Sequence, residues 1–354
     1  MRHFKTYIMP SGPSEWLEYP ILSQKISDYM KNAIAEVSDG DIVIGESLEH
    51  AFGSILVCLR PCPCLSTDLL GYMTEQTASI LMTKGSPLAI FGMAEDVKEA
   101  LAHEDYSAFE PVEAPPGDAF YVLESYGAYL AQESLRERIN MRHLKSGVML
   151  MSPQTTFIAP DAIIGKGTTI LPGCMINSGT VIGEGCTIGP NTVLDNAIVG
   201  DGTKLNNVQV QDSTIGKNTS IGPFGWVRPG CNIGDNVRIG DFTEFKKANI
   251  GNGTKIAHLT YVGDADLGER INLGCGVVFA NYDGKNKYRS TVGDDAFIGC
   301  NVNLVSPVNI GNGAYIATGS TITEDVEEGA LAIARERMTV KPGWVEKRKA
   351  DGKL

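Results

Sequence analysis

The sequence IAPDAIIGKGTTILPGCMINSGTVIGEGCTI, residues 158–188, repeats one pattern every six positions. An isoleucine occupies each sixth position: Ile158, Ile164, Ile170, Ile176, Ile182 and Ile188. A period of six fits neither an amphipathic helix nor a simple alternating strand. The pattern instead predicts a parallel β-helix, in which each hexapeptide forms one short strand and one turn and three hexapeptides form a triangular coil.

The same rhythm continues, with a slip and an interruption, to Ile322. The aliphatic or aromatic positions that we expect to point inward are Leu194, Ile215, Ile221, Val227, Ile233, Ile239, Phe245, Ile250, Ile256, Val262, Leu267, Leu273, Phe279, Val292, Ile298, Leu304, Ile310, Ile316 and Ile322. Each should stack on its equivalent one coil away, at the spacing of about 4.8 Å that strand hydrogen bonding sets. Glycine directly follows many of these positions, and we expect it to permit an unusual backbone conformation at the corners.

The segments outside the repeat have a different character. The stretches 41–45, 54–59 and 87–92 are short and apolar, as in buried strands, and residues 23–37 contain a helical stretch. Residues 123–141 have good helix formers and apolar residues at helical spacing. We therefore expect a mainly β chain, a left-handed parallel β-helix with a small N-terminal α/β domain. The expected parts are an α/β domain at 1–118, a linker helix within 119–147, the hexapeptide-repeat domain at 148–323 and a basic tail at 324–354.

Composition and charge exclude several classes of function. The 354 residues carry a formal charge of −12, and residues 1–150 hold 21 Asp and Glu against 11 Lys and Arg. No broad basic surface is available for a nucleic-acid backbone, so we expect no nucleic-acid partner. No apolar run reaches the length of about 18 residues that a membrane span requires, and the first residues lack the apolar core of a secretion signal.

The eight cysteines are scattered through a large chain, which predicts reduced thiols and a cytoplasmic protein. Cys58, Cys62 and Cys64 lie close together, but a zinc site there needs a fourth ligand. We interpret them as small buried side chains, and we predict no metal site.

Arg228 and Lys246 are 18 positions apart in an unbroken part of the repeat, each one residue after an inward position. They should therefore lie one above the other on adjacent coils, where two cations repel unless an anion is near. One interpretation is a ligand phosphate or carboxylate, and the other is a solvated pair neutralised locally by Glu244.

His258 is the only histidine within the repeat, and imidazole has the pKa that general-base catalysis near neutral pH requires. The rhythm is interrupted at length between Phe279 and Val292 by a polar loop, which we expect to leave the solenoid and reach a neighbouring surface. We do not expect a cysteine nucleophile, because neither Cys275 nor Cys300 has a histidine one or two residues away.

Six segments together resemble one family: GPFGWVRPG (222–230), FTEFKKA (242–248), HLTYVGDADLG (258–268), INLGCG (271–276), NYDGKNK (281–287) and GALAIAR (329–335). The chain, from about Leu135 to its end, is similar to the C-terminal acetyltransferase domain of the bifunctional glucosamine-1-phosphate N-acetyltransferase and N-acetylglucosamine-1-phosphate uridylyltransferase family. The resemblance implies acetyl-CoA as co-substrate, a small-molecule sugar phosphate as acceptor, and a homotrimer with active sites between protomers.

The resemblance also implies roles for particular residues. The catalytic base falls on His258. The sugar-phosphate contacts fall on Arg228, Lys246, Tyr261 and Asn272. The acetyl-CoA contacts fall on Cys275, Asn281, Tyr282, Cys300, Thr318 and Arg335. Cys275, Cys300 and Thr318 depart from the Ala, Ser and Ala usual in the family, which puts the affinity for the coenzyme in question.

Residues 1–118 depart further from the family, whose other half is a nucleotidyltransferase about twice as long. They lack its Gly-rich phosphate loop of the type L-x-A-G-x-G-T-R and the positions of its metal ligands. We expect a reduced remnant without uridylyltransferase activity.

The expected function is N-acetylation of glucosamine 1-phosphate to N-acetylglucosamine 1-phosphate, on the route to UDP-N-acetylglucosamine and cell-wall synthesis. Two alternatives stay open. One is an N-acetyltransferase that acts on another amino-sugar phosphate or on a nucleotide-linked amino sugar. The other is a non-catalytic trimeric binding protein that has lost the coenzyme.

Overall fold

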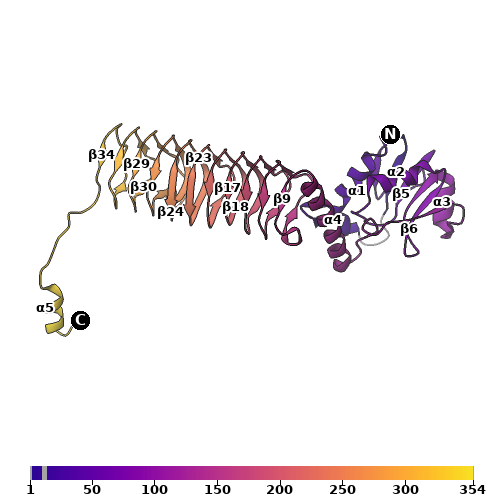
Figure 1. Cartoon of the computed structure of the whole chain (residues 1–354), viewed down its shortest axis with the longest axis horizontal. Coiled ribbons are helices and arrows are strands. Elements are labelled where there is room, and N and C mark those ends of the chain that lie inside the picture. The colour runs from indigo at the N-terminus through magenta and orange to yellow at the C-terminus, as the bar shows by residue number, and fades with distance from the viewer. Residues whose placement is uncertain (1, 10–13, 354) are drawn as a thin grey trace. The chain divides into compact units, whose positions relative to one another are not determined.

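The computed structural model describes residues 2–9 and 14–353, and it divides into two compact units, residues 1–198 and residues 199–354. The first unit contains an α/β portion, a long helix and the first coils of the repeat. The second contains the remaining coils and a C-terminal segment (Figure 1). The α/β portion and the hexapeptide solenoid that the sequence predicts are both present.

The α/β portion is built on a mixed six-stranded sheet in the order β4-β1-β5-β7-β6-β8. Pairing is parallel between β1 and each of β4 and β5 and between β6 and β8, whereas β7 runs antiparallel to both of its neighbours. The strands are β1 (Lys5–Ile8), β4 (Ile42–Ile44), β5 (Ser54–Cys58), β6 (Ser79–Thr83), β7 (Ser86–Met93) and β8 (Glu110–Glu113). The pattern predicted β4, β5 and β7 but not the other three.

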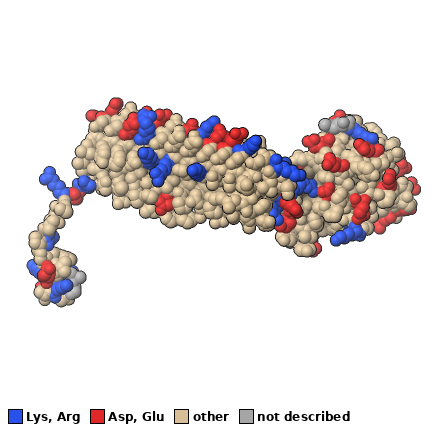
Figure 2. All heavy atoms as spheres, viewed as in Figure 1, with Lys and Arg blue, Asp and Glu red and all other residues tan. Residues whose placement is uncertain are grey.

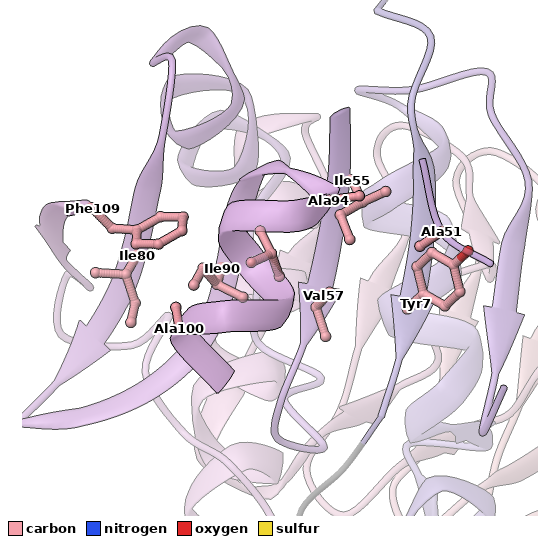
Figure 3. Close-up of a cluster of buried hydrophobic side chains, with 10 residues drawn as sticks. Tyr7, Ala51, Ile55, Val57, Ile80, Ile90, Ala94, Ala100 and Phe109 are labelled. Carbon is pink, nitrogen blue, oxygen red and sulfur yellow. The ribbon is translucent and has the colours of Figure 1, made fainter. Parts of the chain in front are cut away.

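Helix α3 covers part of this sheet with small side chains (Figure 3). Ile55, Val57 and Ile90 from the strands are fully buried beneath Ala94 and Ala100 of the helix. The helices of this portion are α1 (Ile26–Ala35), α2 (Thr67–Glu75) and α3 (Ala94–His103), with a 3-10 turn η1 (Ser14–Glu18) and a hairpin of β2 (Pro20–Ile21) and β3 (Gln24–Lys25). The predicted linker helix is α4 (Ser125–Lys145), a little longer than the stretch of good helix formers.

The coils of the first unit consist of two-residue strands, up to the longer β16. They are β9 (Met149–Leu150), β10 (Phe157–Ile158), β11 (Ile163–Ile164), β12 (Thr169–Ile170), β13 (Met175–Ile176), β14 (Val181–Ile182), β15 (Thr187–Ile188) and β16 (Val193–Val199), with a 3-10 turn η2 (Pro153–Thr155) before β10. Partners pair in parallel, as in Phe157 with Met175 and Thr169 with Thr187, because each strand meets its equivalent one coil later.

The second unit has the same architecture, with three strands of seven or eight residues before the polar loop. Its strands are β17 (Lys204–Leu205), β18 (Val208–Ile215), β19 (Ser220–Ile221), β20 (Gly225–Val227), β21 (Asn232–Ile233), β22 (Arg238–Asp241), β23 (Thr243–Ile250), β24 (Lys255–His258), β25 (Tyr261–Leu267), β26 (Asn272–Leu273), β27 (Val278–Ala280), β28 (Ser290–Val292), β29 (Phe297–Ile298), β30 (Asn303–Val305), β31 (Asn309–Ile310), β32 (Tyr315–Ile316), β33 (Thr321–Ile322) and β34 (Leu331–Ala332). The ladder reaches Ala334, whose carbonyl accepts from the Thr321 N–H. Helix α5 (Trp344–Ala350) follows and has no buried residue.

All of the positions predicted to point inward are buried, which confirms the six-residue period. The explanation of the glycines was wrong at several positions, Gly274 among them. Gly274 does not need a left-handed backbone; a Cβ there would lie 2.7 Å from the backbone nitrogen of Cys300 on the next coil. Glycine is therefore required at this corner because consecutive coils approach too closely for any side chain.

The coil that contains the polar loop is longer than the others. Leu267 pairs with Val292, 25 positions later, whereas Val292 pairs with Ile310 after 18. The insertion is thus accommodated without disturbing the register above and below it. In the part of the chain that the structure describes, no helix has both the length and the apolar character to cross a membrane.

Candidate active site

Four predicted site residues align at one corner of consecutive coils. The register pairs Ile256 with Leu273, Leu273 with Ile298, and Ile298 with Ile316. His258, Cys275, Cys300 and Thr318 each follow one of these inward residues by two positions, so they lie one above another. We call these four residues, with Asp241 directly below His258, the corner column.

Backbone hydrogen bonds hold the corner column in place. The N–H of Gly276 donates to the His258 carbonyl at 3.2 Å, that of Asn301 to the Cys275 carbonyl at 2.7 Å, and that of Gly319 to the Cys300 carbonyl at 2.8 Å. These N–H groups come from residues with left-handed backbones, with φ of 75° at Gly276, 53° at Asn301 and 74° at Gly319. Gly and Asn adopt this conformation at little cost, whereas Leu259, whose N–H donates to the Asp241 carbonyl at 3.1 Å, holds it with a φ of 48°.

Asp241 positions the imidazole of His258. The Asp241 carboxylate is hydrogen-bonded to Nδ1 of the imidazole, and this bond lowers the pKa of the Asp241 side chain. If Nδ1 carries the proton that Asp241 accepts, Nε2 presents its lone pair and can take a proton from a substrate. Asp241 was not among the residues predicted from the sequence. The signal was available, since Asp241 lies 17 positions before His258, about one coil length.

Arg335 completes the upper end of the corner column. Its Nη1 donates to the backbone carbonyl of Thr318, so the structure brings together these two predicted acetyl-CoA contacts. The exposed guanidinium therefore lies beside the upper end of the line that begins at His258.

The second group of predicted residues is cationic. Val227 pairs with Phe245, which places Arg228 and Lys246 on adjacent coils as predicted. Arg228 is paired with Glu244 at 2.7 Å and lies over the Trp226 ring at 4.8 Å. The local interpretation is therefore met at Arg228, which Glu244 neutralises, whereas a ligand phosphate or carboxylate at this pair stays a prediction.

Lys287, from the polar loop, lies beside Lys246. This second ammonium group lowers the pKa of Lys246, and Arg228 acts in the same direction. Three cations are gathered here, with Glu244 on Arg228 and Asp264 acting on Lys246 in the opposite direction, and an anionic ligand would neutralise the remaining positive charge. The sequence predicts a polar loop here but not the position of Lys287 beside Lys246.

Gly263 allows Tyr261 and Asn281 to approach this cationic group. Lys246 is the register partner of Gly263. A Cβ on Gly263 would lie 2.3 Å from the Tyr261 hydroxyl and 2.7 Å from Nδ2 of Asn281. A predicted sugar contact and a predicted coenzyme contact therefore lie together over Gly263, where a side chain would force both of them to move.

The polar loop folds back onto its own coils. Asn281 donates from Nδ2 to Asp264 at 2.6 Å, and Arg289 binds the carboxylate of Asp266 and, at 2.8 Å, the carbonyl of Lys247. Asp283 accepts from the N–H groups of Lys285 and Asn286, which lower its pKa. The exposed Tyr282 donates to the Gly284 carbonyl within the loop. That the loop also reaches a neighbouring surface stays a prediction.

Asn272 is separate from the other predicted sugar contacts. It lies in β26, which pairs with β24 and β29, whereas Arg228, Lys246 and Tyr261 lie in or next to the paired strands β20, β23 and β25. A single chain therefore divides the predicted residues into the corner column with Arg335, the cationic group with Tyr261 and Asn281, Tyr282 within the polar loop, and Asn272. An open cavity of about 700 Å³ near Val292, Ile310 and Val326 is lined by none of them.

The three neighbouring N-terminal cysteines are buried, as expected. Cys62 donates to the carbonyl of Phe120 at 3.1 Å, and Cys64 lies against that of Ala131 at 3.6 Å. Across residues 2–9 and 14–353, no group of three or more His, Cys, Asp or Glu side chains has the arrangement of a metal site.

The sequence comparisons support the resemblance inferred from the motifs. A family model described as the GMPPB C-terminal domain matches residues 157–250, and the bacterial transferase hexapeptide model (six repeats) matches residues 289–324. The chain is 56% identical over 215 residues to the bifunctional protein GlmU of Clostridium perfringens (strain SM101 / Type A), covering 61% of this chain and 47% of the relative. It is 52% identical over 218 residues to that of Clostridioides difficile (strain 630), covering 62% and 48%.

The chain thus spans about half the length of the curated relatives it matches. Among solved structures, an Arabidopsis UDP-N-acetylglucosamine acyltransferase matches with a TM-score of 0.40 and 21% identity, covering 57% of this chain and 77% of the other.

Proposed function

We propose that this chain is an N-acetyltransferase that moves the acetyl group of acetyl-CoA to the amine of glucosamine 1-phosphate. The observation that supports this most is the corner column. Asp241 holds the imidazole of His258 at its lower end, and Arg335 lies at its upper end. The identity to the GlmU proteins over the coils is the second support.

The side chains divide the work in this proposal. Arg228, Lys246 and Lys287 bind the phosphate, and Tyr261 and Asn272 orient the sugar. Nε2 of His258 takes a proton from the amine as the new N–C bond forms, the thioester C–S bond breaks, and the proton passes to the departing coenzyme thiolate. Positioned base catalysis of this kind contributes about 10²–10⁴-fold. No acyl-enzyme is needed, since the amine attacks the thioester directly.

We propose that Cys275, Asn281, Tyr282, Cys300, Thr318 and Arg335 bind acetyl-CoA. Arg335 is the member with a charge for the coenzyme phosphates, and Cys275, Cys300 and Thr318 form the surface on which the pantetheine arm lies. The small side chains at these three positions, in register on consecutive coils, support an elongated ligand that runs parallel to the solenoid axis.

We propose a homotrimer whose protomers complete each other's sites. The separation of Asn272 from the cationic group supports this, because a substrate that contacts both needs a second copy. Figure 2 shows that much of the visible side face of the coils is uncharged. Phe224 and Phe242 stack at 5.1 Å while each is more than half exposed (53% and 56%). Association would remove this apolar surface from water.

We propose that the reaction takes place in the cytoplasm. No disulfide joins any of the eight cysteines, and six of them are buried. Cysteines without disulfides are typical of a reducing compartment.

The test is release of free coenzyme A thiol by the full chain with acetyl-CoA and a panel of amino sugars. We expect release with glucosamine 1-phosphate and little with glucosamine, which lacks the phosphate. Release only with a nucleotide-linked amino sugar would favour the alternative acceptor. No release with any acceptor would favour the binding protein.

The proposed function does not include uridylyl transfer, and we expect none from residues 1–118. With UTP, Mg²⁺ and N-acetylglucosamine 1-phosphate, the full chain should release no pyrophosphate above the background without enzyme. Turnover in this assay would overturn the interpretation of these residues as a remnant.

A further inference from the structure

Cys275 and Cys300 are neighbours on two adjacent coils. Leu273 pairs with Ile298, and each cysteine follows its member of that pair by two positions. The N–H of Asn301 donates to the Cys275 carbonyl at 2.7 Å, so the ladder is intact where the two cysteines lie. Adjacent parallel strands lie about 4.8 Å apart. That spacing falls within the Cα separation of about 4.4–6.8 Å over which a disulfide forms.

These two thiols differ from the other six. Cys300 is exposed and Cys275 partly exposed, whereas Cys58, Cys62, Cys64, Cys174, Cys186 and Cys231 are all buried. Burial raises the pKa of Cys58 and of Cys64 to about 12, which leaves hardly any thiolate at neutral pH. A reagent in solution therefore meets a single accessible pair of thiols.

The position of the pair links it to the coenzyme. His258 lies one coil below Cys275, and Thr318 with Arg335 lies one coil above Cys300. If acetyl-CoA lies along the corner column, its sulfur is at the level of His258, next to Cys275. A coenzyme disulfide that enters the same groove would bring its sulfur atoms against these cysteines.

We propose that Cys275 and Cys300 form a dithiol site that reacts with small-molecule disulfides, and with the disulfide of coenzyme A in particular. The preference for the coenzyme rests on the proposed function, whereas the dithiol chemistry does not. The more exposed Cys300 thiolate attacks one sulfur of the small disulfide, whose S–S bond breaks and releases one small thiol.

Cys275 then attacks the sulfur of Cys300 and releases the second small thiol. The products are a disulfide between coils and two reduced small thiols, which take up the two protons that the cysteines lose, so that atoms and electrons balance. The bridge would cross the groove between His258 and Thr318. Acetyl-CoA binding should therefore be lost in the oxidised protein and restored by a reducing agent.

The test is mass spectrometry of the full chain after incubation with coenzyme A disulfide or with glutathione disulfide, followed by alkylation of the remaining thiols. The wild-type protein should lose two alkylatable thiols, retain no adduct, and yield one cross-linked peptide containing Cys275 and Cys300. The Cys275→Ala variant should stop at a mixed disulfide on Cys300. The Cys231→Ala variant, which lacks a buried thiol of the same solenoid, is the matched control and should cross-link as the wild type does.

Separate adducts on both cysteines without a cross-link, or two thiols that stay alkylatable, would overturn the dithiol site. Coenzyme A disulfide should react at least about tenfold faster than glutathione disulfide, since binding in the groove raises its local concentration. Acetyl-CoA should also slow the reaction. If the cross-link forms but neither effect is seen, the dithiol stands and the placement of the coenzyme fails.

Discussion

The N-terminal sheet and the solenoid are both held by strand pairing, but they relate sequence to space in different ways. In the sheet, β5 pairs with β1 in parallel and with β7 in antiparallel, and the strand order does not follow the chain. In the coils of the second unit, each strand pairs in parallel with its equivalent one coil later, usually after 17 or 18 positions. The number of positions between two residues of the solenoid therefore predicts whether they are neighbours on adjacent coils.

This difference decides where a function can be inferred. Asp241 and His258 are 17 positions apart and in contact, and Cys275, Cys300 and Thr318 continue the same line. In the α/β portion, Cys58, Cys62 and Cys64 are close in sequence but point to different backbone carbonyls or into the core. Closeness in sequence therefore did not predict a site among these cysteines, whereas the period of the repeat predicted a candidate site in the solenoid.

The strongest test of this contrast is His258→Ala. If the chemistry lies in the corner column, kcat should fall at least about 100-fold, because a positioned base contributes that much or more. The measurement is coenzyme A release at saturating acetyl-CoA and glucosamine 1-phosphate, with circular dichroism to check the fold. His50→Ala, an exposed histidine of the N-terminal region, is the control and should keep full turnover. Near-normal kcat in His258→Ala would remove this residue from the mechanism.

A smaller loss is expected for Lys287→Ala. Removing one charged hydrogen bond to a phosphate should raise KM for glucosamine 1-phosphate by about 10–100-fold, since such bonds contribute about 1.5–3 kcal/mol. Lys285→Ala changes the same loop at a position whose backbone N–H, not its side chain, binds Asp283, and it should behave as the wild type. Equal effects of the two variants would indicate that the loop acts only through its overall charge.

Asp241→Asn should reduce kcat, though by less than His258→Ala does, because the amide can still bond Nδ1 but no longer favours one tautomer of the imidazole. KM should change little. The pH profile of kcat separates this from a structural defect: its acidic limb should move in Asp241→Asn and stay in place in a merely destabilised protein. An unchanged profile with unchanged kcat would show that Asp241 does not position His258.

The smallest expected effect is the local opening of the polar loop at low pH. Arg289 lowers the pKa of Asp266, and backbone N–H groups lower that of Asp283, so the folded loop favours both charged carboxylates. The stabilisation they give is complete above the ordinary Asp pKa near 3.8 and is lost as pH falls through the lowered values. Hydrogen exchange, corrected for its intrinsic pH dependence, should show residues 281–289 opening in acid before the coils do.

Asp266→Asn provides the matching control at neutral pH. It should raise exchange in the same loop without acid, because Arg289 loses its charged partner while the backbone ladder is untouched. Uniform exchange of loop and coils in either experiment would contradict the local anchoring.

Much of the solenoid was predictable because its period is repeated many times. The inward positions, the stacking of Arg228 on Lys246 and the loop after Phe279 all follow from counting along the chain. The sheet was less predictable, since β1, β6 and β8 lack a repeated pattern and owe their places to non-local pairing. The position of Lys287 beside Lys246 could not be predicted from the period either, because an inserted loop does not follow the register of the repeat.

The sequence by itself determined the period, the buried stack and the family resemblance of the second half of the chain, because each depends on residues at fixed spacing. Only the tertiary structure decided that Asp241 holds His258, that Lys287 joins Lys246, and that Cys275 lies beside Cys300. These contacts join residues that the chain separates by a whole coil or more. These contacts form only when backbone hydrogen bonds hold each coil on the next, and the proposed chemistry of these residues depends on the contacts.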